Sequence, residues 1–499
     1  MAILRLPPTL ILIHAYAWMR VHVRNRCVLG CERTLAGMTH APDISTLGEL
    51  RTAGFKYRPV REELRDNLLA KLRAGEDPWP GLHGLEHTVI PQVERAIIAG
   101  HDIVLLGERG QGKTRLLRTL PLLLDEWTPV IADSELREHP LHPITAASQR
   151  RVEQEGDELP IAWLNRAERY SEKLATPDTS VADLIGDVDP MRVAEGRRLG
   201  DPETIHYGLI PRSNRGIVAI NELPDLAERI QVAMLNVMEE ADIQIRGYML
   251  RLPLDVLVVA SANPEDYTNR GRIITPLKDR FGAEVRTHYP LELADEIAVI
   301  RQEADLGADV PDAILEVLAR FTRALRESEA VNQRAGVSAR FAIAGAETVA
   351  AAATHRAAVR GEDNPVARLV DLEAAVDVLG GKVEFEHGEE GREWEILEYV
   401  LRNAIAETVR PRIRGLDFAP LIQALDGSTY ITTGGQVTAA EFLRDLPQLE
   451  PAGLYDDLSA AFGARTDGEK AAAIELGVEA LYLTRKISKD SGEGETIYG

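Results

Sequence analysis

The chain shows two kinds of hydrophobic pattern, which predict an α/β part followed by a helical part. Mainly apolar runs at residues 103–106, 217–220 and 255–262 each lead into glycine or polar residues, as buried strands of a parallel sheet do. Residues 312–318 and the alanine-rich stretch 341–359 carry apolar positions at i, i+3 and i+4, which is typical of amphipathic helices. The sequence therefore predicts a parallel sheet flanked by helices, with a mainly helical C-terminal region.

The first strand runs into a glycine-rich segment that predicts a phosphate-binding loop. Residues 107–114 fit the pattern G-x-x-x-x-G-K-[ST], with a strand before it and a helix after it. The glycines let successive backbone N–H groups face a β-phosphate at the helix N-terminus. Lys113 is placed to reach the β- and γ-phosphates, and the Thr114 hydroxyl is a ligand for Mg²⁺. The predicted phosphate-binding residues are Gly107, Glu108, Arg109, Gly110, Gln111, Gly112, Lys113, Thr114 and Arg115.

The two later strands end in polar side chains that suit a nucleotide site, because such sheets bind ligands at the carboxyl ends of their strands. Glu222, after the second strand, is the expected base that orients an attacking water. Asn221 stands where an Asp usually holds the Mg²⁺ shell; its amide oxygen accepts a hydrogen bond from a metal-bound water but brings no charge. Asn263, after the third strand, suits sensing of a γ-phosphate, although an Asn-Pro pair is also a common turn opener.

With further segments in the same order, these strands make the chain resemble an AAA+ ATPase, and within that class the MoxR and magnesium-chelatase ATPase-subunit group. The segments that carry the resemblance are 107–114, 215–223, 235–245 (a helix ending in Met-Glu-Glu, then a β-hairpin), 263–264, 277–281 (Leu-Lys-Asp-Arg-Phe) and 336–340 (Gly-Val-Ser-Ala-Arg). The resemblance implies an α/β P-loop AAA+ core with a helical lid, and ATP and Mg²⁺ as cofactors.

The resemblance also assigns two arginines. Arg280 would stabilise transition-state charge on the γ-phosphate of a neighbouring subunit, and the alternative is a local ion pair with Asp279 or Glu284. Arg340 would contact phosphates from the lid of its own subunit, and the alternative is a surface arginine at a helix start. The predicted catalytic residues are thus Lys113, Glu222, Asn263, Arg280 and Arg340, and the predicted metal-site residues are Thr114 and, through water, Asn221.

Motifs and composition shifts predict the domain order. The expected parts are an N-terminal helical segment at 38–83, an AAA+ core at 84–291, a helical lid at 292–360, a mainly helical region at 361–486 and a disordered polar tail at 487–499. Within 134–215 of the core, the pattern of residues 181–186 and 209–216 resembles the family's helix-2 insert, a projection that contacts substrate or a partner. A peripheral loop elaboration is the alternative.

Residues 1–37 differ from the rest of the chain. They carry five Arg and one acid, a net charge of +4, and they hold both cysteines, Cys27 and Cys31. A secretory signal with a cleavage site at residues 15–17 and a zinc half-site at the cysteines are two interpretations. The favoured interpretation is a non-structural extension ahead of a start at Met38.

Charge and composition argue against other classes of function. The 499 residues contain 57 basic and 79 acidic side chains, and the formal net charge of −22 becomes −26 without residues 1–37. Such acidity argues against a broad nucleic-acid-binding surface. No apolar run reaches the ~20 residues that a membrane-spanning helix needs. His139 and His142, in a proline-flanked segment, fit an extended loop better than a metal site.

The sequence therefore predicts a cytoplasmic AAA+ ATPase, similar to magnesium chelatase subunit I, that works in a homo-oligomeric ring, expected to be a hexamer. Its ATP hydrolysis would remodel or activate a partner complex, and the cytoplasmic placement rests on the need for ATP. The resemblance implies a partner with a von Willebrand factor A domain, and either metal chelation or chaperone-like maturation as the task. We favour maturation because nothing in the chain suggests a porphyrin site. The alternative, which Asn221 keeps open, is a nucleotide-binding regulatory scaffold with slow or no hydrolysis.

Overall fold

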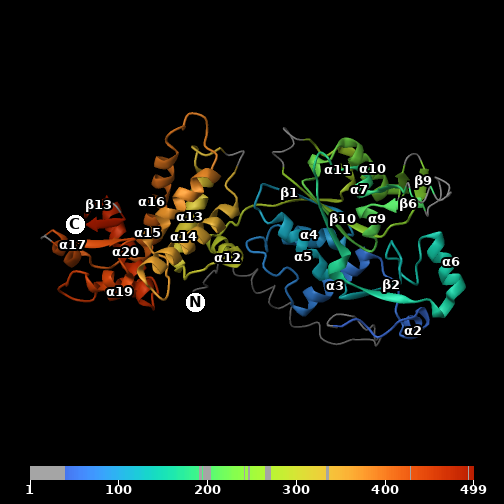
Figure 1. Ribbon diagram of the computed structural model, residues 1–499, viewed down its shortest axis with the longest axis horizontal. Helices are drawn as coiled ribbons and strands as arrows, with labels where there is room; N and C mark the ends of the chain where they lie inside the picture. Colours follow the sequence, from blue (N-terminus) through green and yellow to red (C-terminus); the bar gives the residue numbers. More distant parts are fainter. Residues whose placement is uncertain are drawn as a thin grey trace, which may run out of the picture.

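The computed structural model describes residues 40–499, except residues 190, 192–193, 195–203, 241, 246–247, 264–270, 333–335, 427–428 and 493. The interpretations of residues 1–37 fall outside the described residues. Figure 1 shows an α/β lobe, coloured blue to green, and a helical lobe, coloured yellow to red, with α12 on the side of the helical lobe that faces the sheet. Within the described part of the chain, no helix is both long and apolar enough to cross a bilayer.

The centre of the α/β lobe is a five-stranded sheet in which every strand pair is parallel. Its order is β11–β1–β10–β7–β4, so β10 separates the strand that leads into the phosphate-binding loop from the strand that ends in Asn221. The strands are β1 (Ile103–Leu106), β4 (Tyr170–Leu174), β7 (Gly216–Asn221), β10 (Val256–Ala262) and β11 (Ala283–Arg286). The three strands predicted from apolar runs are confirmed, and their carboxyl ends lie next to one another along one edge.

Helices cover both faces of this sheet, because its strand residues are apolar on both sides. Leu105, Ala219 and Val259 face a core formed with α3, α4 and α5, whereas Val218 and Ala260 face a core formed with α7, α10 and α11. These helices are α3 (Val60–Ala74), α4 (Ile90–Ile98), α5 (Lys113–Thr119), α7 (Val181–Leu184), α10 (Glu228–Glu240) and α11 (Thr275–Arg280). The predicted α/β class is therefore confirmed.

Shorter elements surround the sheet. The antiparallel pairs are β2 (Trp127–Ile131) with β3 (Ile161–Asn165), β5 (Gly186–Val188) with β6 (Ile205–Tyr207), and β8 (Asp242–Ile245) with β9 (Tyr248–Arg251). The remaining helices of this lobe are α2 (Leu47–Thr52), α6 (Ala146–Glu155) and α9 (Leu209–Arg212). The β8–β9 pair is the hairpin expected after α10. Within the stretch 134–215, where the helix-2 insert is expected, β4 belongs to the main sheet.

The helical lobe contains two hydrophobic cores. The first is formed mainly by α12 (Leu293–Glu303), α13 (Asp312–Glu327), α14 (Ala339–Arg360), α15 (Leu369–Leu379) and α16 (Glu393–Arg412). The second is formed by α17 (Ala419–Leu425), α18 (Ala439–Arg444), α19 (Leu454–Ala461), α20 (Asp467–Leu483), β12 (Ile431–Gly434) and β14 (Glu495–Tyr498). The boundary predicted after residue 360 does not separate two cores, since α15 and α16 pack with the predicted lid helices.

The prediction of a disordered tail at 487–499 is wrong. The hairpin of β13 (Lys489–Gly492) and β14 adds to β12, so the tail completes a three-stranded sheet. Tyr498 is only 1% exposed, and its hydroxyl donates a hydrogen bond to the carboxylate of Glu479 in α20. The polar hairpin is ordered because it buries this one aromatic ring and pairs its backbone with β12.

Candidate functional site

The predicted phosphate-binding loop connects β1 to α5 at the carboxyl edge of the sheet. Gly110 and Gly112 both have a φ of +77°, a left-handed conformation that residues with a Cβ rarely adopt. Lys113 begins α5 and is 7% exposed. Its Nζ donates hydrogen bonds to the carbonyl oxygens of Gly107, at 2.5 Å, and Glu108, at 2.7 Å. The loop thus has the curled backbone that the motif requires, with the ammonium group inside it.

Gln111 and Thr287 complete the interior of the loop. The Gln111 Oε1 accepts hydrogen bonds from the Glu108 backbone nitrogen, at 3.0 Å, and from the Thr287 hydroxyl, at 2.9 Å. A Cβ on Gly107 would lie 2.0 Å from the Thr287 Oγ1, so only glycine fits there. Thr287 directly follows β11, and no motif in the sequence marks it. The Gln111 side chain thus ties the Glu108 backbone to the end of β11 and holds the loop in its curled form.

The ends of β7 and β10 bring the other predicted polar residues to the same edge. Asn221 is 8% exposed; its Nδ2 donates to the Glu172 Oε1 at 2.7 Å, and its Oδ1 accepts from the Ser261 hydroxyl at 3.0 Å. Glu222 is half-buried and has a φ of +56°, and its backbone nitrogen lies 3.4 Å from the same Ser261 hydroxyl. Asn263, after β10, is 5% exposed. A left-handed glutamate held in this way is the kind of backbone strain that clusters at functional sites.

Glu172 in β4 is a residue of this edge that the sequence analysis missed. Its carboxylate accepts two hydrogen bonds from Arg118 of α5, from Nε at 2.8 Å and from Nη2 at 3.1 Å. The Tyr170 hydroxyl donates to the Glu172 Oε2 at 3.2 Å. Hydrogen bonding to Arg118 is the main cause that lowers the pKa of Glu172, so the carboxylate is ionised at neutral pH. No signal could have found it, because β4 contains no apolar run and its neighbours are distant in sequence.

The predicted lid reaches the loop through the first residues of α14. A Cβ on Gly110 would lie 2.6 Å from the Ser338 Cβ, which shows how closely the start of this helix approaches the loop. The Tyr289 hydroxyl, from the segment between the lobes, donates to the Arg109 carbonyl oxygen at 2.7 Å. Arg340 is exposed in the first turn of α14. The structure therefore brings the helix that carries Arg340 to the phosphate-binding loop.

Arg115 ties α5 to the lid. Its Nη1 forms an ion pair with Glu303 of α12, and its Nε donates to the Gly81 carbonyl oxygen at 3.0 Å. The Gln302 Nε2 donates to the same carbonyl oxygen at 3.0 Å. These contacts fix the lid beside the P-loop helix.

Arg280 ends α11, and its local contacts differ from the expected alternative. Its Nη2 donates to the Met238 carbonyl oxygen at 3.1 Å, and its Nη1 lies 4.0 Å from the Glu239 Oε1. Glu284 is paired with Lys278 instead, at 2.9 Å. The Arg280 side chain is 40% exposed. The structure therefore places Arg280 on the surface, with these contacts at the end of α10.

The residues at this edge fit Mg²⁺ in their chemistry. Mg²⁺ prefers oxygen ligands, keeps several waters and binds together with substrate phosphates. The Thr114 hydroxyl lies in the first turn of α5, and Asn221 and Glu222 supply amide and carboxylate oxygens at the end of β7. The Asn221 Oδ1, which accepts one hydrogen bond from Ser261, has a second lone pair for a metal-bound water.

His139 and His142 are the two ends of a tight turn and not part of the extended loop that the sequence predicts, since the His142 backbone nitrogen donates to the His139 carbonyl oxygen at 2.8 Å. Tyr57 stacks on His142 with ring centroids 4.3 Å apart, and the His139 Nδ1 accepts a hydrogen bond from the Leu141 backbone nitrogen at 3.0 Å. Burial holds the pKa of His139 well below its ordinary value, so the ring is neutral. Among the described residues, no group of three or more His, Cys, Asp or Glu side chains is arranged to hold a metal ion.

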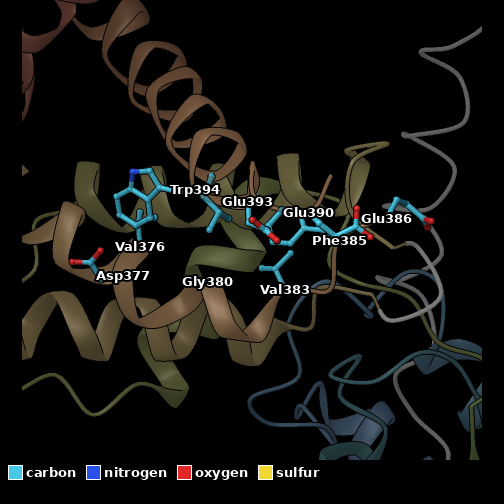
Figure 2. Close-up of a pocket in the computed structure, with 10 residues that line it drawn as sticks. Val376, Asp377, Gly380, Val383, Phe385, Glu386, Glu390, Glu393 and Trp394 are labelled. Atoms are coloured by element: carbon cyan, nitrogen blue, oxygen red, sulfur yellow. The ribbon is translucent and has the colours of Figure 1, made fainter. Parts of the chain in front are cut away.

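A separate cavity of about 530 Å³ lies in the helical lobe, at the junction of α15 and α16. Figure 2 shows Trp394 beside Val376 at one end of it and Phe385 beside Glu386 at the other. Its carboxylates are Asp377, Glu386, Glu390 and Glu393. Because four carboxylates repel the phosphates of a nucleotide, this cavity does not compete with the loop after β1 as a nucleotide site.

Sequence comparison finds a relative for part of the chain. The chain is 27% identical over 210 residues to magnesium-chelatase subunit ChlI-2, chloroplastic, of Arabidopsis thaliana. The match covers 41% of this chain and 47% of that protein. The chain thus spans about half the length of this curated relative. No protein-family model matches the chain.

Structural comparison returns loose superpositions on solved structures. A complex of subunits BchI and BchD of magnesium chelatase gives a TM-score of 0.34 at 20% identity, covering 65% of this chain and 98% of that chain. The Holliday junction branch migration motor RuvB of Thermotoga maritima gives a TM-score of 0.33 at 12% identity, covering 87% of this chain and 90% of that chain.

The parallel sheet with β10 between β1 and β7, and the phosphate-binding loop at its carboxyl edge, define a P-loop nucleotide-binding protein. The chain is similar over 210 residues to a magnesium-chelatase subunit, which agrees with the resemblance of its ordered motifs to AAA+ ATPases of the MoxR and magnesium-chelatase group.

Proposed function

We propose that the chain binds ATP with Mg²⁺ and hydrolyses it, and that it does so in a homo-oligomeric ring that remodels or activates a partner complex. The observation that carries the proposal is the convergence of the curled loop after β1 with the polar ends of β7 and β10 at one sheet edge. The hydrolysis follows from Glu222, the carboxylate that directly follows β7 at this edge.

In this proposal each residue has a defined task. The Lys113 ammonium exchanges the Gly107 carbonyl for β- and γ-phosphate oxygens, which are stronger acceptors. Glu222 orients the attacking water, and Asn263 contacts the γ-phosphate. Thr114 and, through water, Asn221 hold Mg²⁺, which supplies charge neutralisation at the phosphates.

The ring part of the proposal concerns Arg280 and Arg340. The side chain of Arg280 is 40% exposed and is held by a hydrogen bond to a carbonyl and a 4.0 Å ion pair, so a neighbouring subunit's γ-phosphate can displace these contacts. Arg340 serves the phosphates of its own subunit from the start of α14. We propose a closed ring, which repeats the same subunit interface, and by resemblance to the family we propose that it is a hexamer.

The partner part rests on analogy with the chelatase subunits. BchI occurs in a complex with BchD. By this analogy, we propose a partner with a von Willebrand factor A domain, a MoxR-like chaperone task and a cytoplasmic location. Nucleic acid is a poor partner for a chain of net charge −22.

The second candidate function is a regulatory scaffold that binds nucleotide but hydrolyses it slowly or not at all. It is favoured by one observation, the neutral Asn221 in place of an acid at the metal. Steady-state ATP hydrolysis of the purified full chain separates the two functions. Turnover that disappears in Lys113→Ala and Glu222→Gln supports the ATPase, whereas wild type that binds ATP but turns over no faster than these variants supports the scaffold.

The ring is tested by mixing subunits. Arg280→Ala and Lys113→Ala subunits, each inactive alone, should regain activity when they are mixed, because an intact phosphate-binding loop of one variant then meets the intact Arg280 of the other across the interface. A mixture as inactive as its two components would contradict a role for Arg280 across the interface.

A further inference from the structure

The environment of Asn221 explains why an amide stands at this position. Its Nδ2 donates to the Glu172 Oε1 at 2.7 Å, and its Oδ1 accepts from the Ser261 hydroxyl at 3.0 Å. An ionised carboxylate only accepts hydrogen bonds, so the group that faces Glu172 must be a donor. An aspartate at residue 221 would place a second carboxylate against the first, and two carboxylates at such a distance repel each other strongly.

Glu172 lies on the face of the sheet that contains the phosphate-binding helix. In the parallel register of β4 and β7, Glu172 is opposite Ala219, so its side chain lies on the same face as Ala219 and Asn221. This face is covered by α5, and Arg118 of α5 grips the Glu172 carboxylate with two nitrogens, at 2.8 and 3.1 Å. Arg118 is one helical turn beyond Thr114. The carboxylate is therefore held between the metal-site residue of β7 and the helix that carries the Thr114 hydroxyl.

We propose that Glu172 is a positioning residue of the nucleotide site, and that it carries the negative charge that residue 221 lacks. This inference rests on the proposed function, since the charge matters only where Mg²⁺ and nucleotide bind. The carboxylate lies on β4 and not at the end of the neighbouring strand β7. Asn221 connects it to the metal site through the hydrogen bond from its Nδ2. Glu172 fixes the orientation of the amide, so that the Asn221 Oδ1 is presented as the acceptor. Asn221 is then an adaptation to its neighbour and does not mark a disabled ATPase.

The alternative is that Glu172 only anchors α5 to β4 through Arg118. The two roles predict different effects when the carboxylate is moved from residue 172 to residue 221. Glu172→Gln keeps the size of the side chain and can still accept the Asn221 hydrogen bond through its amide oxygen, but it removes the charge. Asn221→Asp combined with Glu172→Gln returns the charge to residue 221, and the amide nitrogen introduced at residue 172 can then donate to the new carboxylate.

The experiment is a double-variant cycle on the full chain, with two measurements. The first is the Mg²⁺ concentration needed for half-maximal binding of a fluorescent ADP analogue. We expect Glu172→Gln to raise this concentration about tenfold, and the double variant Asn221→Asp/Glu172→Gln to return it to within about threefold of wild type. Glu284→Gln is the control, because Glu284 is also an ion-paired carboxylate, paired with Lys278 at 2.9 Å at the opposite edge of the sheet; its side chain is 29% exposed, against 21% for that of Glu172. It should leave the Mg²⁺ requirement unchanged.

The second measurement is the thermal unfolding of the same variants without nucleotide and Mg²⁺. Asn221→Asp alone should lower the midpoint by several degrees, since it creates the carboxylate pair, and the added Glu172→Gln should restore it. An unchanged Mg²⁺ requirement in Glu172→Gln, or a double variant no better than the single variants in both measurements, would overturn the inference. Failure of the proposed function looks different: wild type itself would show no Mg²⁺-dependent nucleotide binding.

Discussion

At the residue scale, the phosphate-binding loop depends on glycines for two separate reasons. Gly110 needs its left-handed backbone, with a φ of +77°, and it also needs the absence of a Cβ, because Ser338 of the lid lies against it. Gly107 needs only the absence of a Cβ, because the Thr287 hydroxyl fills that space. The motif thus encodes contact with the lid and with β11 as well as the curl around a phosphate.

The Gly110→Ala variant tests the contact between Gly110 and the lid. The added Cβ would be 2.6 Å from the Ser338 Cβ, so the loop or the lid must move. We expect nucleotide affinity to fall at least about tenfold, and stability to fall by about 1–2 kcal/mol from the left-handed backbone. The matched control is Gly54→Ala, which has the same φ of +77° but no neighbour within 4 Å. Equal losses of affinity in both variants, measured by equilibrium binding, would contradict the lid contact.

The buried His139 makes a pH-dependent contribution to stability. Burial lowers its pKa in the folded chain below the unfolded value of about 6.5, so the unfolded chain binds the extra proton first as the pH falls. The free energy of unfolding should therefore decrease below about pH 6.5, and His139→Gln should remove part of this decrease. Denaturant titrations of both proteins between about pH 7.5 and pH 5.5 measure the difference in slope. A His139→Gln protein with the same slope as wild type would show that His139 is not the titrating group.

At the element scale, a buried ion pair fixes α3 against the start of β4. Arg169, immediately before β4, donates to both carboxylate oxygens of Glu63, at 2.6 and 2.7 Å, and both side chains are at most 4% exposed. The Asp125 backbone nitrogen donates to the same carboxylate at 2.8 Å. The pair holds the edge strand β4, which carries Glu172, in place. The packing of α3 therefore influences the position of Glu172 at the nucleotide site.

Removal of one partner should be costly. Glu63→Ala leaves the buried Arg169 guanidinium without its carboxylate, and we expect a loss of about 3–5 kcal/mol in the free energy of unfolding. Asp157→Ala is the comparison, because it breaks an ion pair with Arg51 in which the side chains are 66% and 50% exposed, and such pairs contribute about 0–1 kcal/mol. Urea unfolding of both variants decides the matter. A Glu63→Ala loss as small as that of Asp157→Ala would refute the structural role of the pair.

At the scale of the whole molecule, the C-terminal hairpin closes the second core of the helical lobe. Tyr498 reaches this core from β14, and its neighbours Glu479 and Lys489 form an ion pair at 3.0 Å beside it. Burial and the Glu479 charge raise the pKa of Tyr498, so its hydroxyl stays protonated and donates. This core is built from elements other than those around the phosphate-binding loop.

Loss of the aromatic ring should therefore act on stability and not on nucleotide binding. Tyr498→Ala should cost about 3–5 kcal/mol in the unfolding of the C-terminal core, with nucleotide affinity unchanged. Ile497→Ala, at a residue that is 39% exposed in the same strand, should cost about 0.5 kcal/mol or less. Thermal unfolding with a parallel binding titration checks both statements. A Tyr498→Ala protein that is as stable as wild type would support the predicted disorder of the tail.

The sequence by itself determined the class of the protein and most of the candidate site. The P-loop, the polar pair Asn221 and Glu222, and Asn263 were predictable because each depends on a short stretch of chain, in which the spacing of residues sets the local backbone. The apolar runs before them predicted their strands for the same reason.

Only the tertiary structure decided the rest. Glu172, Thr287 and Tyr498 lie in segments without a local signal, and they acquire their partners 49, 176 and 19 residues away along the chain. Their roles depend on which strands become neighbours, and that is set by packing of the entire chain. The amide at residue 221 shows the difference most clearly. In the sequence, Asn221 stands where an acidic residue is expected; in the fold, its Nδ2 donates a hydrogen bond to the carboxylate of Glu172 on the adjacent strand.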